Sequence, residues 1–192
     1  ADVWEFWTRH DSLAQEVDFI TVHILPFWED DPVDIEHALE HVIATRSHVG
    51  EHFAGKQVLI GETGWPSAGR QRQASRPALV NQARYIREFV HQAHARGWDY
   101  NLIEAIDQPW KRALEGTVGG FWGMLDASTL APKFALAGPV AERTNLAGFI
   151  VGALVGALSG LTLGTRRCGG HLLRRTALVM LGASSGLIAV LH

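Results

Sequence analysis

Cysteine is almost absent from this chain of 192 residues. The single cysteine, Cys168, excludes a disulfide within the chain and a zinc cluster built from cysteines. Low-complexity stretches are also missing, and 47% of the residues are apolar. A chain with this composition can bury a substantial core, so we expect a folded protein rather than a disordered one.

Acidic residues are absent from the tail of the sequence. All 20 of them lie before Leu146, whereas residues 146–192 hold four of the 17 basic residues. The other 13 basic residues leave residues 1–145 with a net charge near minus seven. Because phosphate contacts need clustered Lys and Arg, this acidic part is a poor candidate for binding nucleic acid.

Charges of either sign are missing from two stretches of the tail. Residues 146–164 form an uncharged run of 19, and residues 177–191 form a second run of 15. The first run is long enough to cross a hydrocarbon core of about 30 Å as a helix. We therefore predict a transmembrane helix over 146–164 and a second, truncated one over 177–192. The chain also starts at Ala1 without a signal peptide, so we expect it to be a piece of a longer protein.

The segment 165–176, between the two predicted spans, is rich in arginine. It contains Arg166, Arg167, Arg174 and Arg175. An excess of positive charge beside a span marks the cytoplasmic side. Residues 1–145 are then expected on the periplasmic or extracellular side of the cell (inner) membrane, in a multi-pass protein.

Glycine recurs at every fourth position of the first predicted span, at Gly148, Gly152, Gly156, Gly160 and Gly164. This spacing puts a glycine groove along one helix face, which lets another helix approach closely. A neighbouring span of the same chain explains the groove better than a dimer does.

Short apolar runs alternate with helical patterns before the tail. Strands are predicted by the runs at 2–6, 17–25, 57–61 and 100–106. Helices are predicted by the periodicity at 35–53 and 79–93, the second of which is closed by Gly97. Four alternating units predict an α/β fold with a parallel sheet, and they amount to half of a (β/α)8 TIM barrel.

The segment GETGWPSAG, residues 61–69, points to chemistry. Glu62 is the first polar side chain after the predicted strand 57–61. Catalytic residues of TIM barrels lie at the carboxyl ends of the strands, so Glu62 is placed to reach a substrate. Trp65 offers a flat face for a sugar ring, and Pro66 stiffens the corner that aims it. A carboxylate beside aromatic platforms indicates glycoside chemistry.

This segment resembles the nucleophile signature of glycoside hydrolase family 17, the β-1,3-glucanase and glucanosyltransferase family with a (β/α)8 barrel. Three more segments are similar to bacterial, membrane-attached members, in the expected order: VDFITVHILPFWED at 17–30, IDQPWK at 106–111 and GGFWGM at 119–124. The resemblance covers roughly residues 1–140 and implies the C-terminal half of the barrel, with Glu62 as the nucleophile. In IDQPWK, Asp107 and Lys111 match the plant pattern, whereas Gln108 replaces a Glu.

Further side chains at or beyond the predicted strand ends are candidates for substrate binding: Trp4, Glu5, His23, Trp28, Trp65, Asp107, Lys111 and Trp122. Two alternatives stay open. His23 is explained equally well as a hydrogen-bonded barrel histidine. Asp107 and Lys111 could instead form a structural ion pair at the barrel rim.

A histidine stripe offers a competing site. His37, His41, His48 and His52 are spaced four, seven and four apart, and they fall within one arc of the predicted helix. The i, i+4 spacing can hold zinc. However, the arc lies away from the apolar face and has no carboxylate placed as a general base. A solvated stripe is the better interpretation, and we predict no metal site.

We therefore expect a membrane-anchored, retaining enzyme that hydrolyses or transfers β-1,3-glucan without a metal or organic cofactor. Retaining chemistry also needs a carboxylic acid that protonates the departing oxygen. The resemblance implies that this acid lies on a strand before Ala1, so this chain alone is expected to be inactive. The contrasting hypothesis is a non-catalytic glucan-binding or sensing module coupled to transmembrane helices, which has no need of Glu62.

Overall fold

The computed structural model of the chain describes residues 1–142, 146–167, 176 and 179–181. The first compact unit is Ala1–Glu142, close to the predicted domain 1–145. The helix α5 (Leu146–Arg167) belongs to the second unit. The candidate site lies in the first unit, and each unit is considered by itself.

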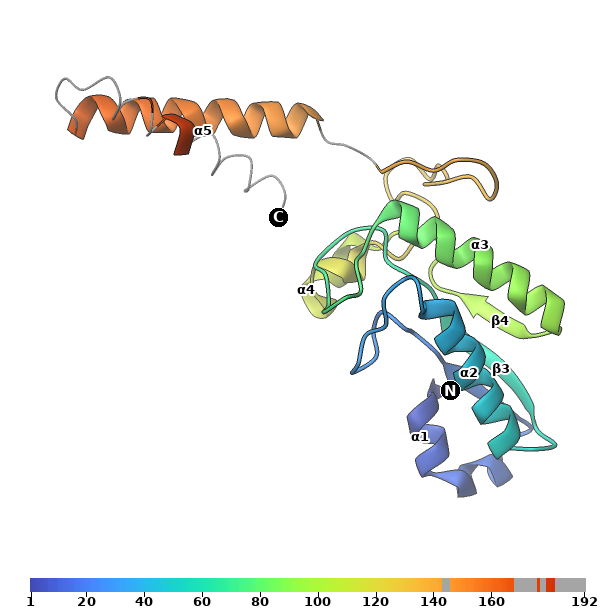
Figure 1. The fold of residues 1–192 in the computed structure, drawn as a ribbon. Coiled ribbons are helices and arrows are strands. Elements are labelled where there is room, and N and C mark those ends of the chain that lie inside the picture. The colour runs from blue at the N-terminus through green and yellow to red at the C-terminus, as the bar shows by residue number, and fades with distance from the viewer. Residues whose placement is uncertain (143–145, 168–175, 177–178, 182–192) are drawn as a thin grey trace. The chain divides into compact units, whose positions relative to one another are not determined.

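A parallel sheet organises the first unit (Figure 1). Its four strands lie side by side in sequence order: β1 (Asp2–Val3), β2 (Phe19–His23), β3 (Gln57–Thr63) and β4 (Asp99–Leu102). Consecutive strands of a TIM barrel pair in this order and direction. The observed sheet therefore fits a partial barrel, as the alternating pattern predicted.

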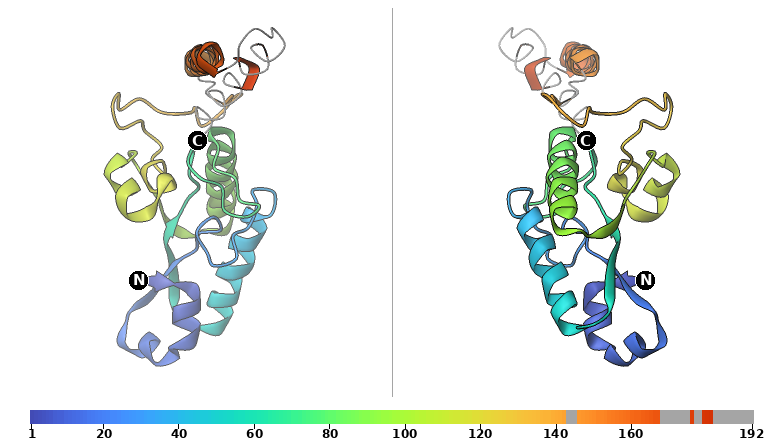
Figure 2. Two further views of the ribbon diagram at one scale, coloured as in Figure 1. Left: turned by 90° about the vertical axis from the view of Figure 1, so that its left-hand side faces the viewer. Right: turned by 90° about the vertical axis from the view of Figure 1, so that its right-hand side faces the viewer.

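Helices connect the central strands. The helix α2 (Ala38–His52) joins β2 to β3, and α3 (Leu79–Arg96) joins β3 to β4. Gly97 ends α3 in the left-handed conformation, at φ 62°, which glycine adopts without a steric penalty. Figure 2 shows both helices on the same side of the sheet. The two predicted helices are thus confirmed.

The core lies between α2, α3 and the face of the sheet that these two helices cover. Along β2 and β3 every second residue is buried, as strand geometry requires, and these residues are Ile20, Val22, Val58 and Ile60. They belong to one hydrophobic cluster with residues of α2 and α3 that include Val42, Val49, Ile86 and Phe89. The other face of the sheet is more open, and Phe19 there is 48% exposed.

The predicted first strand, 2–6, is wrong in extent. Only Asp2–Val3 pairs with β2, and the helix α1 (Trp4–Arg9) begins at the next residue, followed by the 3-10 helix η1 (Asp11–Glu16). The helical turn buries the Trp7 indole, whose N–H donates to the Thr21 carbonyl oxygen at 2.8 Å. This long-range contact outweighs the strand propensity of the aromatic residues.

Beyond β4 the chain folds into short helical turns above the carboxyl end of the sheet. These are η2 (Pro109–Lys111), α4 (Arg112–Glu115) and η3 (Thr117–Gly120). The predicted strand 100–106 therefore ends early, at Leu102. Ile103 and Glu104, which follow the end of β4, line the candidate site.

The predicted span 146–164 is confirmed as a helix, within α5. Among the residues that the structure describes, no helix combines the length and the apolar character needed to cross a membrane. That finding departs from the predicted transmembrane helix. Most of the arginine-rich segment and of the second predicted span, 177–192, lies outside the described residues. All five spaced glycines lie on α5, and their role in helix packing stays a prediction.

Candidate active site

Glu62 stands at the carboxyl end of β3, beside His23 at the end of β2. The two residues face each other across a register shift, and His23 Nδ1 lies 3.1 Å from Glu62 Oε2. The side chain of Glu62 is 44% exposed, whereas that of His23 is 19% exposed. The imidazole therefore orients a carboxylate that solvent and substrate can still reach. This geometry places His23 against Glu62, and its role as a barrel histidine or as a substrate contact stays a prediction.

The backbone on the far side of Glu62 is fixed from the core. Thr63 is buried, and its Oγ1 lies 2.5 Å from the hydroxyl of Tyr85 on α3. Burial raises the pKa of Tyr85, so its phenol stays neutral and keeps the hydrogen bond. The peptide that carries Glu62 is thus held between β2 and α3.

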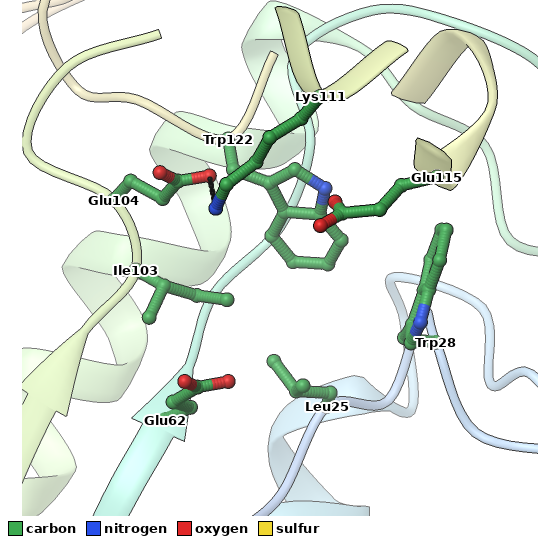
Figure 3. Close-up of a pocket in the computed structure, with 8 residues that line it drawn as sticks. All are labelled: Leu25, Trp28, Glu62, Ile103, Glu104, Lys111, Glu115 and Trp122. Atoms are coloured by element: carbon green, nitrogen blue, oxygen red, sulfur yellow. Dashed lines mark hydrogen bonds and ion pairs between the residues drawn. The ribbon is translucent and has the colours of Figure 1, made fainter. Parts of the chain in front are cut away.

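A cavity of about 500 Å³ opens in front of Glu62 (Figure 3). It is lined by Leu25, Trp28, Glu62, Ile103, Glu104, Lys111, Glu115 and Trp122. These residues come from the end of β3 and from the segments that follow β2 and β4, where TIM barrels carry their catalytic groups. The structure thus brings together four of the predicted site residues: Glu62, Trp28, Lys111 and Trp122.

Glu104 is a second carboxylate of this cavity, and the sequence analysis missed it. It is 9% exposed and accepts a hydrogen bond from Lys111 Nζ at 2.9 Å. Its other oxygen accepts from the side-chain amide of Gln108. Because both oxygens are engaged, Glu104 is a poor candidate for donating a proton to a substrate. The amide of Gln108 thus donates to Glu104. A Glu at position 108 would instead place a second negative charge beside it.

Asp107 does not line this cavity, contrary to its predicted role in substrate binding. It is 8% exposed and accepts a hydrogen bond from the buried Lys133 at 2.8 Å. Lys133 also donates to Ser67 Oγ at 2.7 Å. The alternative of an ion pair between Asp107 and Lys111 is wrong, because Asp107 pairs with Lys133 and Lys111 pairs with Glu104. This pair ties the segments after β3 and β4 to a distant loop.

Trp65 is not a sugar platform in this structure, because none of its surface is exposed. Its ring packs edge to face against Phe27 at 5.5 Å between centroids and lies 5.8 Å from Tyr85. The indole N–H donates to the Arg76 carbonyl oxygen at 3.1 Å. Trp65 therefore supports the site from the core, while Trp28 and Trp122 line the cavity.

Trp4 and Glu5 lie on α1, apart from the cavity of Glu62. Trp4 contacts the ring of His48 edge to face, with 6.2 Å between the centroids. Glu5 lines a separate hollow of about 270 Å³, which Trp28 also borders. Their predicted sugar contacts stay predictions, and neither residue meets Glu62 in that cavity.

The histidine stripe is largely solvated, as predicted, because His37, His48 and His52 are exposed and His41 is half-buried. Three of the four histidines also pair with carboxylates. His41 Nε2 lies 2.8 Å from Glu29 Oε2, His52 Nε2 lies 2.9 Å from Asp11 Oδ1, and His37 Nδ1 lies 2.7 Å from Asp34 Oδ1. The hydrogen bond that the imidazole donates to Glu29 raises the pKa of His41, against the opposing effect of burial. Within the described residues, no group of three or more His, Cys, Asp or Glu side chains could hold a metal ion.

Comparison with known proteins supplies the context for this geometry. A family model described as BtgE/BtgC glycoside hydrolase domain matches residues 1–123. A glucan 1,3-beta-glucosidase of Saccharomyces cerevisiae is 25% identical over 130 residues, which cover 62% of this chain and 40% of that protein. A glucan 1,3-beta-glucosidase of Arthroderma benhamiae is 30% identical over 150 residues, which cover 70% of this chain and 48% of that protein.

Solved structures agree with this match. The glycoside hydrolase family 17 beta-1,3-glucanosyltransferase from Rhizomucor miehei superposes with a TM-score of 0.62 at 28% identity. The match covers 70% of this chain and 48% of that one. The chain thus spans about half the length of the relatives that it matches.

Proposed function

Because the chain belongs to the BtgE/BtgC glycoside hydrolase domain family, we propose that the full-length protein cleaves or transfers β-1,3-glucan with Glu62 as its nucleophile. The predicted resemblance to glycoside hydrolase family 17 is confirmed, while the bacterial, membrane-attached type stays a prediction. A β-glucan substrate is supported by a complex of the Rhizomucor miehei enzyme, in active-site mutant form, with laminaritriose.

The surroundings of Glu62 carry this proposal. Its carboxylate is oriented by His23 at 3.1 Å, remains 44% exposed and faces a cavity of about 500 Å³. The indoles of Trp28 and Trp122 line the same cavity, and Lys111 adds donors for sugar hydroxyl groups. Retaining glycoside chemistry needs an accessible carboxylate as nucleophile, which Glu62 supplies, and the two indoles offer flat faces for sugar rings.

In the proposed reaction Glu62 attacks the anomeric carbon of a bound glucosyl residue. The bond from this carbon to Glu62 forms as the bond to the departing glucan oxygen breaks, and a second carboxylic acid protonates that oxygen. The family resemblance implies that this acid lies on a strand before Ala1, and we propose that position. Glu104 is a poor candidate, because Lys111 and Gln108 engage its two oxygens. The same group, now ionised, later takes a proton from the incoming hydroxyl.

The incoming hydroxyl belongs either to water, which gives hydrolysis, or to another sugar, which gives a longer or branched glucan. Transfer is the proposed main outcome, because sugar-binding surface on the acceptor side competes with water for the intermediate. The similarity to a glucanosyltransferase supports this choice.

The test is Glu62→Gln in the full-length protein, with laminari-oligosaccharides as substrate and products followed by mass. The amide keeps the size of the side chain but cannot attack, so turnover should fall by several orders of magnitude. Glu51→Gln, an exposed change on α2, is the matched control. A loss below about tenfold would rule out the nucleophile assignment. Glucan binding by an unsubstituted protein that never turns glucan over would favour the sensing module instead.

Attachment to the inner membrane, with the glucan domain outside the cytoplasm, is a separate proposal that rests on sequence. It is supported by the uncharged run 146–164 and by the arginines of 165–176. In intact cells, a membrane-impermeant thiol reagent should leave Cys168 unlabelled and should label it after lysis. Ready labelling of intact cells would reverse the proposed orientation.

A further inference from the structure

Gln82 is a wholly buried polar residue of α3, and the reaction proposed above gives it no role. Its side-chain amide donates to the carbonyl oxygen of Trp122 at 3.0 Å and to that of Gly123 at 3.2 Å. Trp122 lines the catalytic cavity. Gln82 thus reaches from a helix to the backbone that carries one wall of this cavity.

The oxygen of the same amide is unpaired. Gln82 Oε1 is buried and has no hydrogen-bond partner among the residues that the structure describes. A buried polar atom without a partner destabilises a fold, and an apolar side chain of the same size would fill the space without that cost. Packing alone therefore does not explain Gln82, whereas its two donated hydrogen bonds do.

The backbone that Gln82 contacts also pairs with the segment after β4. The N–H of Glu104 donates to the Trp122 carbonyl oxygen at 3.0 Å, and the N–H of Met124 donates to the Glu104 carbonyl oxygen at 2.8 Å. The backbones are so close at Gly123 that an added Cβ would clash with Asp107. Residues 122–124 are therefore held both by the segment 104–107 and by Gln82.

The Trp122 ring is part of the wall beside Glu62 (Figure 3). Only 4% of Trp122 is exposed, so the packing around it fixes its place. The indole contacts Trp28 and Phe27 edge to face, at 6.1 Å and 5.9 Å between centroids. It also lies close to the backbone at Gly64, where an added Cβ would stand 3.3 Å from Trp122 Cε3. A shift of the Trp122 backbone would therefore change the shape of the cavity near the nucleophile.

The helix that carries Gln82 also supports the peptide of Glu62. The hydroxyl of Tyr85, three positions after Gln82, lies 2.5 Å from Thr63 Oγ1. Residues three apart are neighbours on one helix face. One face of α3 thus contacts both the residue next to the nucleophile and the backbone of Trp122, which sets the spacing between them.

We propose that Gln82 is a positioning residue, which holds the Trp122 indole at the distance from Glu62 that glucan cleavage requires. This inference rests on the proposed function and adds a residue that acts through Trp122 rather than on the substrate. Without the amide donors, the Trp122 carbonyl oxygen keeps only its hydrogen bond from Glu104, and the Gly123 carbonyl oxygen loses its bond to Gln82. The Trp122 wall is then free to move, while Glu62 keeps its contact with His23.

The test is Gln82→Met in the full-length protein, assayed as kcat/KM for laminari-oligosaccharides beside a denaturant titration. Methionine keeps the length of the side chain but removes both donors. We expect kcat/KM to fall about ten- to a hundredfold, the scale of a small displacement within a catalytic site. Gln92→Met, the same change at a partly exposed position of α3, should alter kcat/KM by less than about twofold. A folded Gln82→Met protein that matches this control would overturn the proposal.

Gln82→Glu keeps the proposal testable if Gln82→Met folds poorly. Its carboxyl group donates one hydrogen bond when protonated and none when ionised, and burial favours the protonated form. Relative to the unsubstituted protein at the same pH, its kcat/KM should therefore be highest at low pH. A relative kcat/KM that is low at every pH, or that falls as pH falls, would count against the two hydrogen bonds.

A double-mutant cycle with Trp122→Leu separates positioning from a general structural role. If Gln82 acts through the indole, Gln82→Met should lower kcat/KM little further once the indole is gone. Losses that multiply would show that Gln82 acts by another route. If the unsubstituted protein consumes no glucan, the proposed function and the role of Gln82 fail together. Glucan consumption that Gln82→Met leaves unaltered refutes the role of Gln82 alone.

Discussion

Replacement of His23 by alanine tests whether the imidazole orients the nucleophile. In the structure His23 Nδ1 is 3.1 Å from Glu62 Oε2, and the backbone N–H of Ile24 donates to the Glu62 carbonyl oxygen at 3.0 Å. The backbone contact survives the substitution, so the strand end should stay in place. The change then removes the contact between the imidazole and the carboxylate.

The expected loss follows from the exposure of the pair. A hydrogen bond to a charged group is worth about 1.5–3 kcal/mol. With 44% of the Glu62 side chain exposed, water replaces part of the interaction, and the lower end of that range applies. About 1.5 kcal/mol of lost transition-state stabilisation corresponds to a roughly tenfold fall in kcat/KM.

The assay is kcat/KM of the full-length protein for laminari-oligosaccharides, measured for His23→Ala and His23→Asn. The Asn side chain can present an N–H near the position of Nδ1, so we expect it to retain most of the activity. Equal losses in the two variants, or no loss in His23→Ala, would refute the orienting role. A fall confined to the alanine variant would support it.

Three other predictions concern the supports of the site. Trp65→Ala should lower the free energy of unfolding by about 3–5 kcal/mol, because the ring is wholly buried; unchanged denaturant stability would restore the sugar-platform interpretation. Asp107→Asn leaves the Lys133 charge buried, so it should lower the free energy of unfolding by about 3–5 kcal/mol. The double change Asp107→Leu with Lys133→Met should lower it by less than the sum of these two changes made singly. Additive losses in this double-mutant cycle would argue against a direct ion pair. His41 has its pKa raised by Glu29, so its contribution is complete below its ordinary value of 6.5 and is lost as pH rises through the folded-state pKa. The stability gap between the unsubstituted protein and His41→Gln should therefore be larger near pH 6 than near pH 9, and a gap that widens with pH would contradict this pairing.

The regular elements could be predicted because their patterns are local. β2 and β3 show a buried residue at every second position, and α3 carries a clear apolar face closed by Gly97. The short extent of β1 could not be predicted in this way. Trp4–Arg9 forms a helix because the Trp7 indole reaches the Thr21 carbonyl oxygen, a contact between segments that the sequence does not juxtapose.

In the candidate site, too, features set by the local sequence could be predicted, and features set by contacts between distant residues could not. Glu62 was predictable, because its place after a strand and its family signature are both local. The burial of Trp65 depends on Phe27 and Tyr85, which lie far from it in the sequence. Glu104 follows β4 and had a usable signal, an isolated carboxylate beyond a strand seven residues before Lys111. The motif IDQPWK predicted Asp107 as the functional carboxylate instead.

The hollow that Arg70 and Thr117 border could not be predicted, because two separate loops form it. Arg70 and Thr117 are 47 positions apart, and the backbone N–H of Arg70 donates to Thr117 Oγ1. Neither residue lies in a repeating pattern or at a strand end. Only the fold shows that both border a hollow beside Trp28.

Covalent trapping of the glucosyl intermediate tests the central claim most directly. The full-length protein is incubated with a 2-deoxy-2-fluoro β-glucosyl donor that carries a good leaving group, digested, and analysed by mass. Fluorine at C2 disfavours the oxocarbenium-like transition state of both steps, and the good leaving group lets the first step outrun the second, so that an ester accumulates on the nucleophile. We predict one added fluoroglucosyl group, on the carboxylate of Glu62. A group on another residue, such as Glu104 or Glu115, or no trapped ester in a protein that turns over glucan, would contradict the assignment of Glu62.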